Sequence, residues 1–138
     1  LTEVGETGFR YQLTCRRILE AMNGAYRDAG RTRAKYPVNW AYMNPQDMVT
    51  EALGEGDLIE ITSEAGCINA VVKAEDALRR GVISMTHMFG ELQAADEAAE
   101  HAGSFTGRLT SLQRHLQPIN FMPRFSGIPV NLARSKRN

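Results

Sequence analysis

Two adjacent arginines, Arg16 and Arg17, stand where the chain leaves a segment with the pattern of a β-strand. This segment, Phe9–Thr14, alternates aromatic or apolar residues with polar ones, which predicts a strand. An arginine guanidinium donates two parallel hydrogen bonds and therefore suits a phosphate group. Paired arginines are also commonly exposed, solvated charges. The position at a strand end, six residues before Asn23, favours an anion contact for Arg17, whereas both interpretations stay open for Arg16.

The cysteines and histidines give no sign of a catalytic centre. Cys15 and Cys67 are too few for a disulfide scaffold and lack the spacing of a metal site. We expect Cys15 to behave as a small buried hydrophobic residue without chemistry of its own. A single histidine such as His87 more often makes structural hydrogen bonds than acts as an acid or base. The sequence therefore predicts no catalytic residue and no metal ligand in this chain.

The most ordered signature of local structure lies between residues 44 and 90. Asn44 is a good helix N-cap, and Pro45 fits the first helical position. Asp47 is expected to take the part of the acidic residue in a capping box, and Gly54 to end the helix in the left-handed conformation. Short runs rich in Ile and Val follow, separated by tight turns. This pattern predicts a compact unit in which a helix leads into a hairpin and then a further strand.

Over the whole chain, the sequence predicts a mainly β fold with short helices. Strands are expected over 9–14, 38–43, 58–63, 67–73, 82–85 and 128–133, helical segments over 92–101 and 112–116, and loops over 26–37 and 104–110. Three prolines, Pro118, Pro123 and Pro129, prevent long helices near the end of the chain. Six or seven short strands favour a barrel over an open parallel sheet.

Composition bounds the function. The length of 138 residues suits one domain, and 16 basic residues balance 16 acidic ones, which argues against a general nucleic-acid binder. Residues 108–138 contain no acid, so the balance is uneven; a polyanionic ligand or simply solvated basic faces would explain it. No apolar run is long enough to span a bilayer. The chain begins at Leu1, and we expect it to be a fragment of a longer protein, in the cytoplasm rather than the periplasm.

From Phe9 to Ala133 the chain resembles the C-terminal cofactor-binding domain of the molybdopterin-dinucleotide oxidoreductases, the group of formate dehydrogenases and nitrate reductases. The family's Thr-Gly-Arg turn is similar to residues 13–17, and Asn23 stands at the family's distance from Arg17. The block 44–85 resembles the helix, hairpin and strand of the family. The run 85–90 is similar to its His-containing segment, 107–110 to its Asn-x-Leu-Thr element, and 122–130 to one branch's ending.

Two positions depart from the family pattern. Gly107 replaces the usual Asn, which removes a side-chain amide expected at the cofactor, although a backbone N–H remains. Arg16 stands where many members have Gly, so the backbone there approaches a ligand less closely. Neither departure affects the expected fold.

The resemblance implies a double-psi β-barrel over residues 9–133, with residues 1–8 a disordered or linker remnant and 134–138 a flexible tail. It implies that the barrel grips molybdopterin guanine dinucleotide carrying molybdenum or tungsten, while the metal ligand and the iron–sulfur domain lie elsewhere in the parent enzyme. The residues that it places at the cofactor are Thr14, Cys15, Arg16, Arg17, Asn23, Thr86, His87, Thr106, Gly107, Leu109, Thr110 and Arg124.

The implied partners are the remaining domains of the parent oxidoreductase and its electron-transfer subunits, with no nucleic acid and no membrane span. The isolated chain is expected to be inactive. A cofactor-free barrel acting as a protein-interaction module is the main alternative. It would have no need for the matched set Arg17, Asn23, His87 and Leu109–Thr110. A self-processing decarboxylase cleaving between Gly103 and Ser104 is a third alternative, although the surrounding sequence does not resemble that family.

Overall fold

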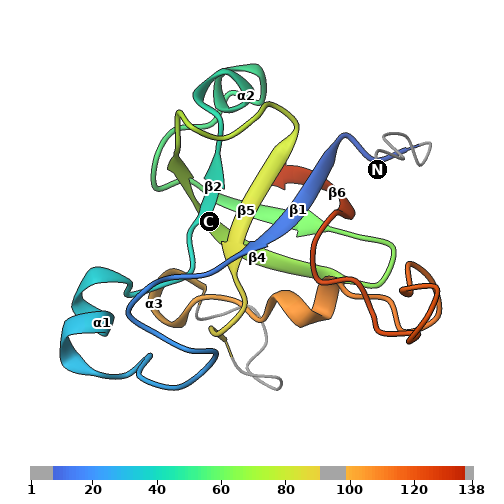
Figure 1. The fold of residues 1–138 in the computed structure, drawn as a ribbon. Helices are drawn as coiled ribbons and strands as arrows, with labels where there is room; N and C mark the ends of the chain where they lie inside the picture. Colours follow the sequence, from blue (N-terminus) through green and yellow to red (C-terminus); the bar gives the residue numbers. More distant parts are fainter. Residues whose placement is uncertain (1–7, 91–98, 136–138) are drawn as a thin grey trace.

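The computed structural model describes residues 8–90 and 99–135 of the chain. Figure 1 shows a barrel with short helices at its ends. The elements in chain order are β1 (Tyr11–Arg16), α1 (Gly30–Lys35), β2 (Ala41–Met43), α2 (Pro45–Thr50), β3 (Leu58–Thr62), β4 (Cys67–Ala74), β5 (Val82–Thr86), α3 (Ala99–Ala102), the 3-10 helix η1 (Thr106–Leu109) and β6 (Ile128–Arg134).

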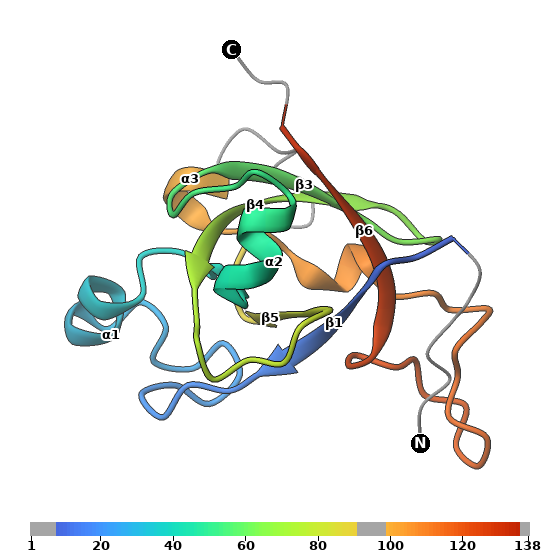
Figure 2. The ribbon, with the colours of Figure 1, turned by 90° about the horizontal axis from the view of Figure 1, so that it is seen from above.

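The strands of the described segments close into one barrel in the order β1-β5-β2-β4-β3-β6. The pairs β1–β5 and β2–β4 are parallel, and the other four are antiparallel. Figure 2 shows the closed barrel from above, with β6 crossing to meet both β1 and β3. The predicted fold, a mainly β double-psi barrel with short helices, is confirmed. For the site, the parallel pairing of β1 with β5 matters most, because it places the ends of these two strands side by side.

The barrel interior is filled by alternate residues of the strands. Leu13 of β1, Ile61 of β3, and Ile83 and Met85 of β5 are at most 1% exposed. Full burial of such a side chain stabilises the fold by roughly 1.5–3 kcal/mol. The interior is therefore a packed core, and any ligand must bind at an end of the barrel or on its surface.

Helix α2 begins as predicted but ends differently. Asn44 Oδ1 accepts a hydrogen bond from Gln46 N at 2.9 Å. The prediction that Gly54 supplies the left-handed residue is wrong, because Ala52 takes this conformation with φ 54°. Leu53 N donates to Met48 O at 2.8 Å, and both side chains are buried. This is a Schellman ending, in which packing of Leu53 on Met48 outweighs the strain at Ala52.

Asp47 does not act in a capping box. Its carboxylate is 4% exposed and accepts hydrogen bonds from Arg80 Nε at 3.0 Å and from Gly81 N at 2.6 Å. The acid therefore ties α2 to the turn that leads into β5. Sequence proximity suggested a local partner, whereas the closed barrel brings a residue 34 positions away within reach.

Several segment boundaries also differ from the predictions. Residues 30–35 form α1 within the predicted loop, since Arg, Ala and Lys are good helix formers and Thr32 is buried. Residues 106–109 form η1 instead of a loop, and 112–116 form no helical turn. The predicted helix 92–101 falls mostly outside the described residues, as do the termini 1–7 and 136–138. None of the described helices is long and apolar enough to cross a membrane.

Candidate binding site at the carboxyl ends of strands β1 and β5

The parallel pairing of β1 and β5 determines where the predicted site residues meet. The register joins Gln12 to Val82 and Arg16 to Thr86, so both strands end at the same end of the barrel. Residues just after these strands, Arg17 and His87, therefore emerge together. In Figure 1 both strands run toward the loop that precedes α1, while α2 lies at the opposite end.

Three predicted site residues form one hydrogen-bonded row. Cys15 Sγ lies 3.1 Å from His87 Nδ1, and His87 Nε2 lies 3.1 Å from Asn23 Oδ1. Asn23 sits in the left-handed conformation with φ 51°, which Asn tolerates better than most residues. Burial raises the pKa of the Cys15 thiol, while the charge of Arg17 and a hydrogen bond from the backbone of His87 act in the opposite direction. The row is thus a thiol that faces an imidazole, with an amide on the far side of the ring.

A cavity of about 370 Å³ opens beside this row. It is lined by Cys15, Arg17, His87, Phe125 and Ser126. Ser126 Oγ accepts from Cys15 N at 2.9 Å, which fixes the 125–126 segment against β1. Arg17 is exposed, and within residues 8–90 and 99–135 no carboxylate pairs with it. A guanidinium without an acidic partner beside a cavity can bind an anionic ligand.

The neighbouring Arg16 is held differently. Its guanidinium carbon lies 4.1 Å from the centre of the Tyr42 ring, and Nη2 lies 3.5 Å from Glu75 Oε2. Arg16 and Arg17 both line a second cavity of about 310 Å³, together with Tyr36. Because the Arg16 guanidinium already contacts Glu75 and the face of the Tyr42 ring, less of its charge is available to a ligand. Of the two arginines, Arg17 is the better placed for binding.

Thr86 lies just inside the site, and a residue that the sequence analysis missed fixes its backbone. Asn39 is 4% exposed, and its Nδ2 donates to Thr86 O and to Ser104 O, both at 2.8 Å. Ser104 N returns a hydrogen bond to Asn39 Oδ1 at 2.8 Å. A polar residue between Val38 and Trp40 was the available signal. Thr86 Oγ1 is buried without a hydrogen-bond partner among the described residues. Thr14, the residue before Cys15, is half-buried.

The loop expected at the cofactor, 106–110, lies mostly inside the molecule. Thr106 is 5% exposed and Leu109 1% exposed, so both side chains belong to the interior. A Cβ on Gly107 would lie 2.5 Å from Cζ of Phe105, which explains the glycine by packing. Thr110 Oγ1 is buried and unpartnered within the described residues. None of these residues lines the Cys15 cavity, and only their backbone and the Thr110 hydroxyl remain for a ligand contact.

Arg124 also lies away from the Cys15 cavity. It lines a separate small cavity with Glu64, Leu109 and His115. The structure therefore joins Cys15, Arg17, Asn23 and His87 into one site and leaves Arg124 outside it.

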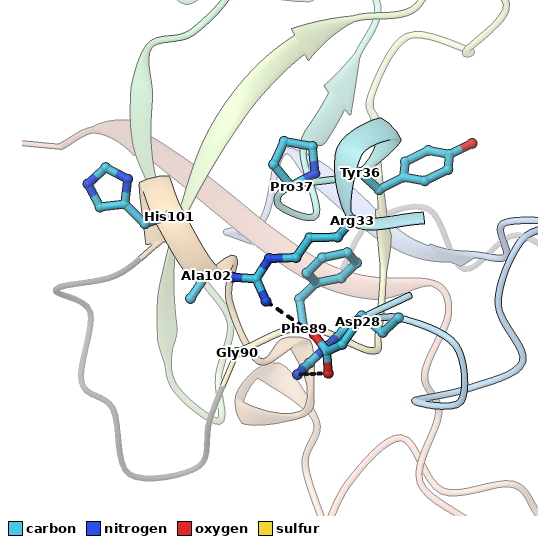
Figure 3. A pocket seen from close by; sticks show the side chains of 9 residues that line it. Asp28, Arg33, Tyr36, Pro37, Phe89, Gly90, His101 and Ala102 are labelled. Carbon is cyan, nitrogen blue, oxygen red and sulfur yellow. Dashed lines mark hydrogen bonds and ion pairs between the residues drawn. The ribbon is translucent and has the colours of Figure 1, made fainter. Parts of the chain in front are cut away.

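A further cavity was not foreseen from the sequence. It measures about 170 Å³ and has Arg27, Asp28, Arg33, Phe89 and His101 among its lining residues. Figure 3 shows the guanidinium of Arg33 directed at Asp28, whose Oδ1 lies 3.4 Å from Arg33 Nη1. Arg27 also pairs with Asp28, at 3.0 Å, and lowers the pKa of its carboxyl. The acid occupies both arginines, so this cavity is less suited to an anion than the one at Arg17.

Comparisons with known proteins identify the family and the fold. Residues 11–129 match the family model described as the molydopterin dinucleotide binding domain. Acetylene hydratase from Pelobacter acetylenicus has a similar solved structure, with a TM-score of 0.76 and 19% sequence identity. The match covers 92% of this chain and 18% of that one, and at this identity it shows the fold alone. No curated protein sequence matches the chain.

Proposed function

This chain belongs to the molydopterin dinucleotide binding domain family, and from this premise we propose that it grips molybdopterin guanine dinucleotide as one domain of a larger molybdenum or tungsten oxidoreductase, formate dehydrogenase-like in class. The observation that carries the proposal is the site at the ends of β1 and β5. There Arg17, with no acidic partner among the described residues, lines the cavity of about 370 Å³ beside His87.

The residues present suit the organic part of such a cofactor. A dinucleotide offers a pyrophosphate, and an arginine fork is a strong donor to phosphate oxygens. The buried hydroxyl of Thr86, next to His87, lacks a partner among the described residues, and a polar group of the cofactor at this end of the barrel would supply one. When bound, the cofactor carries the metal and supplies its redox chemistry, while this chain binds and orients it.

Exposed apolar side chains support further domains as partners. Leu112, Ile119 and Phe121 are 78%, 91% and 70% exposed, and all lie in the segment that leads to Phe125 at the cavity. Exposed apolar side chains gathered in one segment of the chain favour an interaction surface there. The chain spans 18% of the length of acetylene hydratase. We infer that this segment packs on other domains of the parent enzyme. Those domains would include the one with the metal ligand and the iron–sulfur domain, and they would pass electrons to partner subunits. Two free cysteines are compatible with a cytoplasmic location.

The same apolar segment favours one alternative, a cofactor-free barrel that binds another protein. The two functions differ in what they require of Arg17. A docking module gains nothing from an arginine without an acidic partner next to a cavity, whereas an anionic cofactor does. Substitution of Arg17 therefore separates them.

The test compares two arginine variants in the full parent enzyme. Arg17→Ala is expected to lower pterin and metal content, measured by fluorescence of the oxidised pterin and by metal mass spectrometry. Arg79→Ala is the matched control, because Arg79 is exposed in the turn before β5, at the opposite end of the barrel. Far-ultraviolet circular dichroism checks that both variants fold. Normal cofactor content in Arg17→Ala would overturn the proposal.

A further inference from the structure

Cys15, His87 and Asn23 are arranged as an activated nucleophile requires. The two atoms that react, Sγ and Nδ1, lie 3.1 Å apart, and the far side of the imidazole is held at Nε2, also at 3.1 Å. A reactive thiol or hydroxyl is recognised by its hydrogen bond to a base, which is in turn hydrogen-bonded to a group that orients it. The sequence predicted no chemistry for Cys15, because a cysteine is more often a small buried hydrophobic residue. The fold brings His87, 72 positions away, to its sulfur.

The orientation of Asn23 determines which imidazole nitrogen can take a proton. Asn23 Oδ1 only accepts hydrogen bonds, so His87 Nε2 must carry the hydrogen. In a neutral imidazole Nδ1 then has a free lone pair. In this tautomer the lone pair faces Cys15 Sγ at 3.1 Å, so the thiol S–H is the donor of the contact. His87 is thus set to remove the thiol proton at the moment of attack.

The cavity gives a second reactant access to the thiol. Cys15 forms one wall, Phe125, which is 50% exposed, gives an apolar wall, and Arg17 supplies a positive charge without an acidic partner among the described residues. A small molecule that combines a soft sulfur centre with carboxylates matches these three features. A low-molecular-weight disulfide bearing carboxylates is such a molecule.

We propose that Cys15 is a reactive thiol that forms a mixed disulfide with small carboxylate-bearing disulfides, with His87 as the base and Arg17 as the anion contact. Cys15 Sγ attacks one sulfur, a new S–S bond forms, and the old one breaks. The thiol proton passes to His87 Nδ1 and then to the departing thiolate. One disulfide is consumed and one thiol is released, so Cys15 is oxidised as half of the small disulfide is reduced. The adduct fills the cavity and, on the basis of the proposed function, prevents the cofactor from reaching Arg17.

The chain contains its own control in Cys67. This cysteine is exposed at the start of β4, and it has no histidine partner within the described residues. The cofactor-free 138-residue chain is treated with glutathione disulfide, and peptide mass spectrometry follows both cysteines over time. Cys15 is expected to react at least about tenfold faster than Cys67, although it is the less exposed, because a positioned base accelerates proton removal. Equal rates, or a faster Cys67, would overturn the proposal.

Two variants test the assigned roles. His87→Gln should slow the reaction of Cys15 by about 100-fold and leave the reaction rate of Cys67 unchanged. An unchanged rate for Cys15 would exclude His87 as the base. Arg17→Gln should reduce the preference of Cys15 for glutathione disulfide over the neutral bis(2-hydroxyethyl) disulfide by several-fold. An unchanged preference would exclude Arg17 as the anion contact. The comparison of the two cysteines in the unaltered chain needs no variant, so it decides the proposal even if a variant unfolds. Because no cofactor is present, failure here is separate from failure of the proposed function.

Discussion

The side-chain amide of Asn39 donates a hydrogen bond of 2.8 Å to the backbone oxygen of Thr86. The same buried amide also exchanges hydrogen bonds with the backbone of Ser104, which follows Gly103 at the end of α3. One side chain thus satisfies three backbone groups in two segments that are distant in sequence. This contact fixes the backbone at the end of β5, immediately before His87.

Asn39→Ala is therefore expected to destabilise the chain by about 3 kcal/mol, because it leaves several buried backbone groups without partners. Urea unfolding followed by circular dichroism measures the effect. Gln113→Ala, at an exposed position, is the control and should change the free energy of unfolding by less than about 0.5 kcal/mol. Similar effects of the two substitutions would show that Asn39 is not structurally important.

Gly103 is expected to tolerate no side chain. Its φ is +73°, and a Cβ would lie 2.4 Å from Asn39 Oδ1 and 2.8 Å from Phe89 Cβ. Gly103→Ala should cost at least about 2 kcal/mol from backbone strain and crowding together. Gly30→Ala, at the open first position of α1, should be neutral or stabilising. Thermal unfolding of both variants decides this, and a Gly103→Ala variant as stable as the unaltered chain would contradict the described packing.

Asp47 should matter more through the backbone than through its ion pair. Its carboxylate is buried, and it accepts from Gly81 N as well as from Arg80, whose side chain is 61% exposed. Asp47→Ala should cost about 2 kcal/mol, since Gly81 N loses its partner. Arg80→Ala should cost less than about 1 kcal/mol, as expected of an exposed partner. Equal losses in urea unfolding would mean that the ion pair dominates.

Asp57 should contribute to the loss of folding stability at acidic pH. The backbone N–H of Gly54 and then Arg134 hold the pKa of this carboxyl below its ordinary value. A lowered folded-state pKa means stability that is present above the unfolded value of about 3.9 and is lost as the pH falls through the folded value. Asp57→Asn should therefore flatten the decline of unfolding free energy between about pH 5 and about pH 2. Parallel declines in the two proteins would exclude this contribution.

Local signals in the sequence determine much of the barrel. Asn44 and Pro45 start α2 as predicted because capping depends only on adjacent residues. The β-branched runs around Ile59 and Ile68 lie in β3 and β4 for the same reason. The end of α2 was predicted less well, since Ala52 accepts a strained conformation only because Leu53 is buried. Packing of this kind depends on distant parts of the chain.

The site follows the same rule. The position of Arg17 at a strand end was visible in the sequence, and so was the distance to Asn23. The contact between Cys15 and His87 joins residues 72 positions apart, and it depends on the parallel register of β1 and β5. Arg124 and Leu109 matched a sequence pattern too, but the fold places them away from the Cys15 cavity. Motif order predicts which family a chain joins, whereas strand pairing decides which side chains share a site.

Hydrogen–deuterium exchange of the parent enzyme tests the central claim most directly, by comparing cofactor-loaded and cofactor-free protein. Backbone amides in residues 15–24 and 86–90 should exchange more slowly in the loaded enzyme, because the cofactor would cover the ends of β1 and β5. The turn 76–81, at the opposite end of the barrel, should be unchanged. Unaltered exchange in residues 15–24 and 86–90, or protection only at the turn, would contradict this placement of the cofactor.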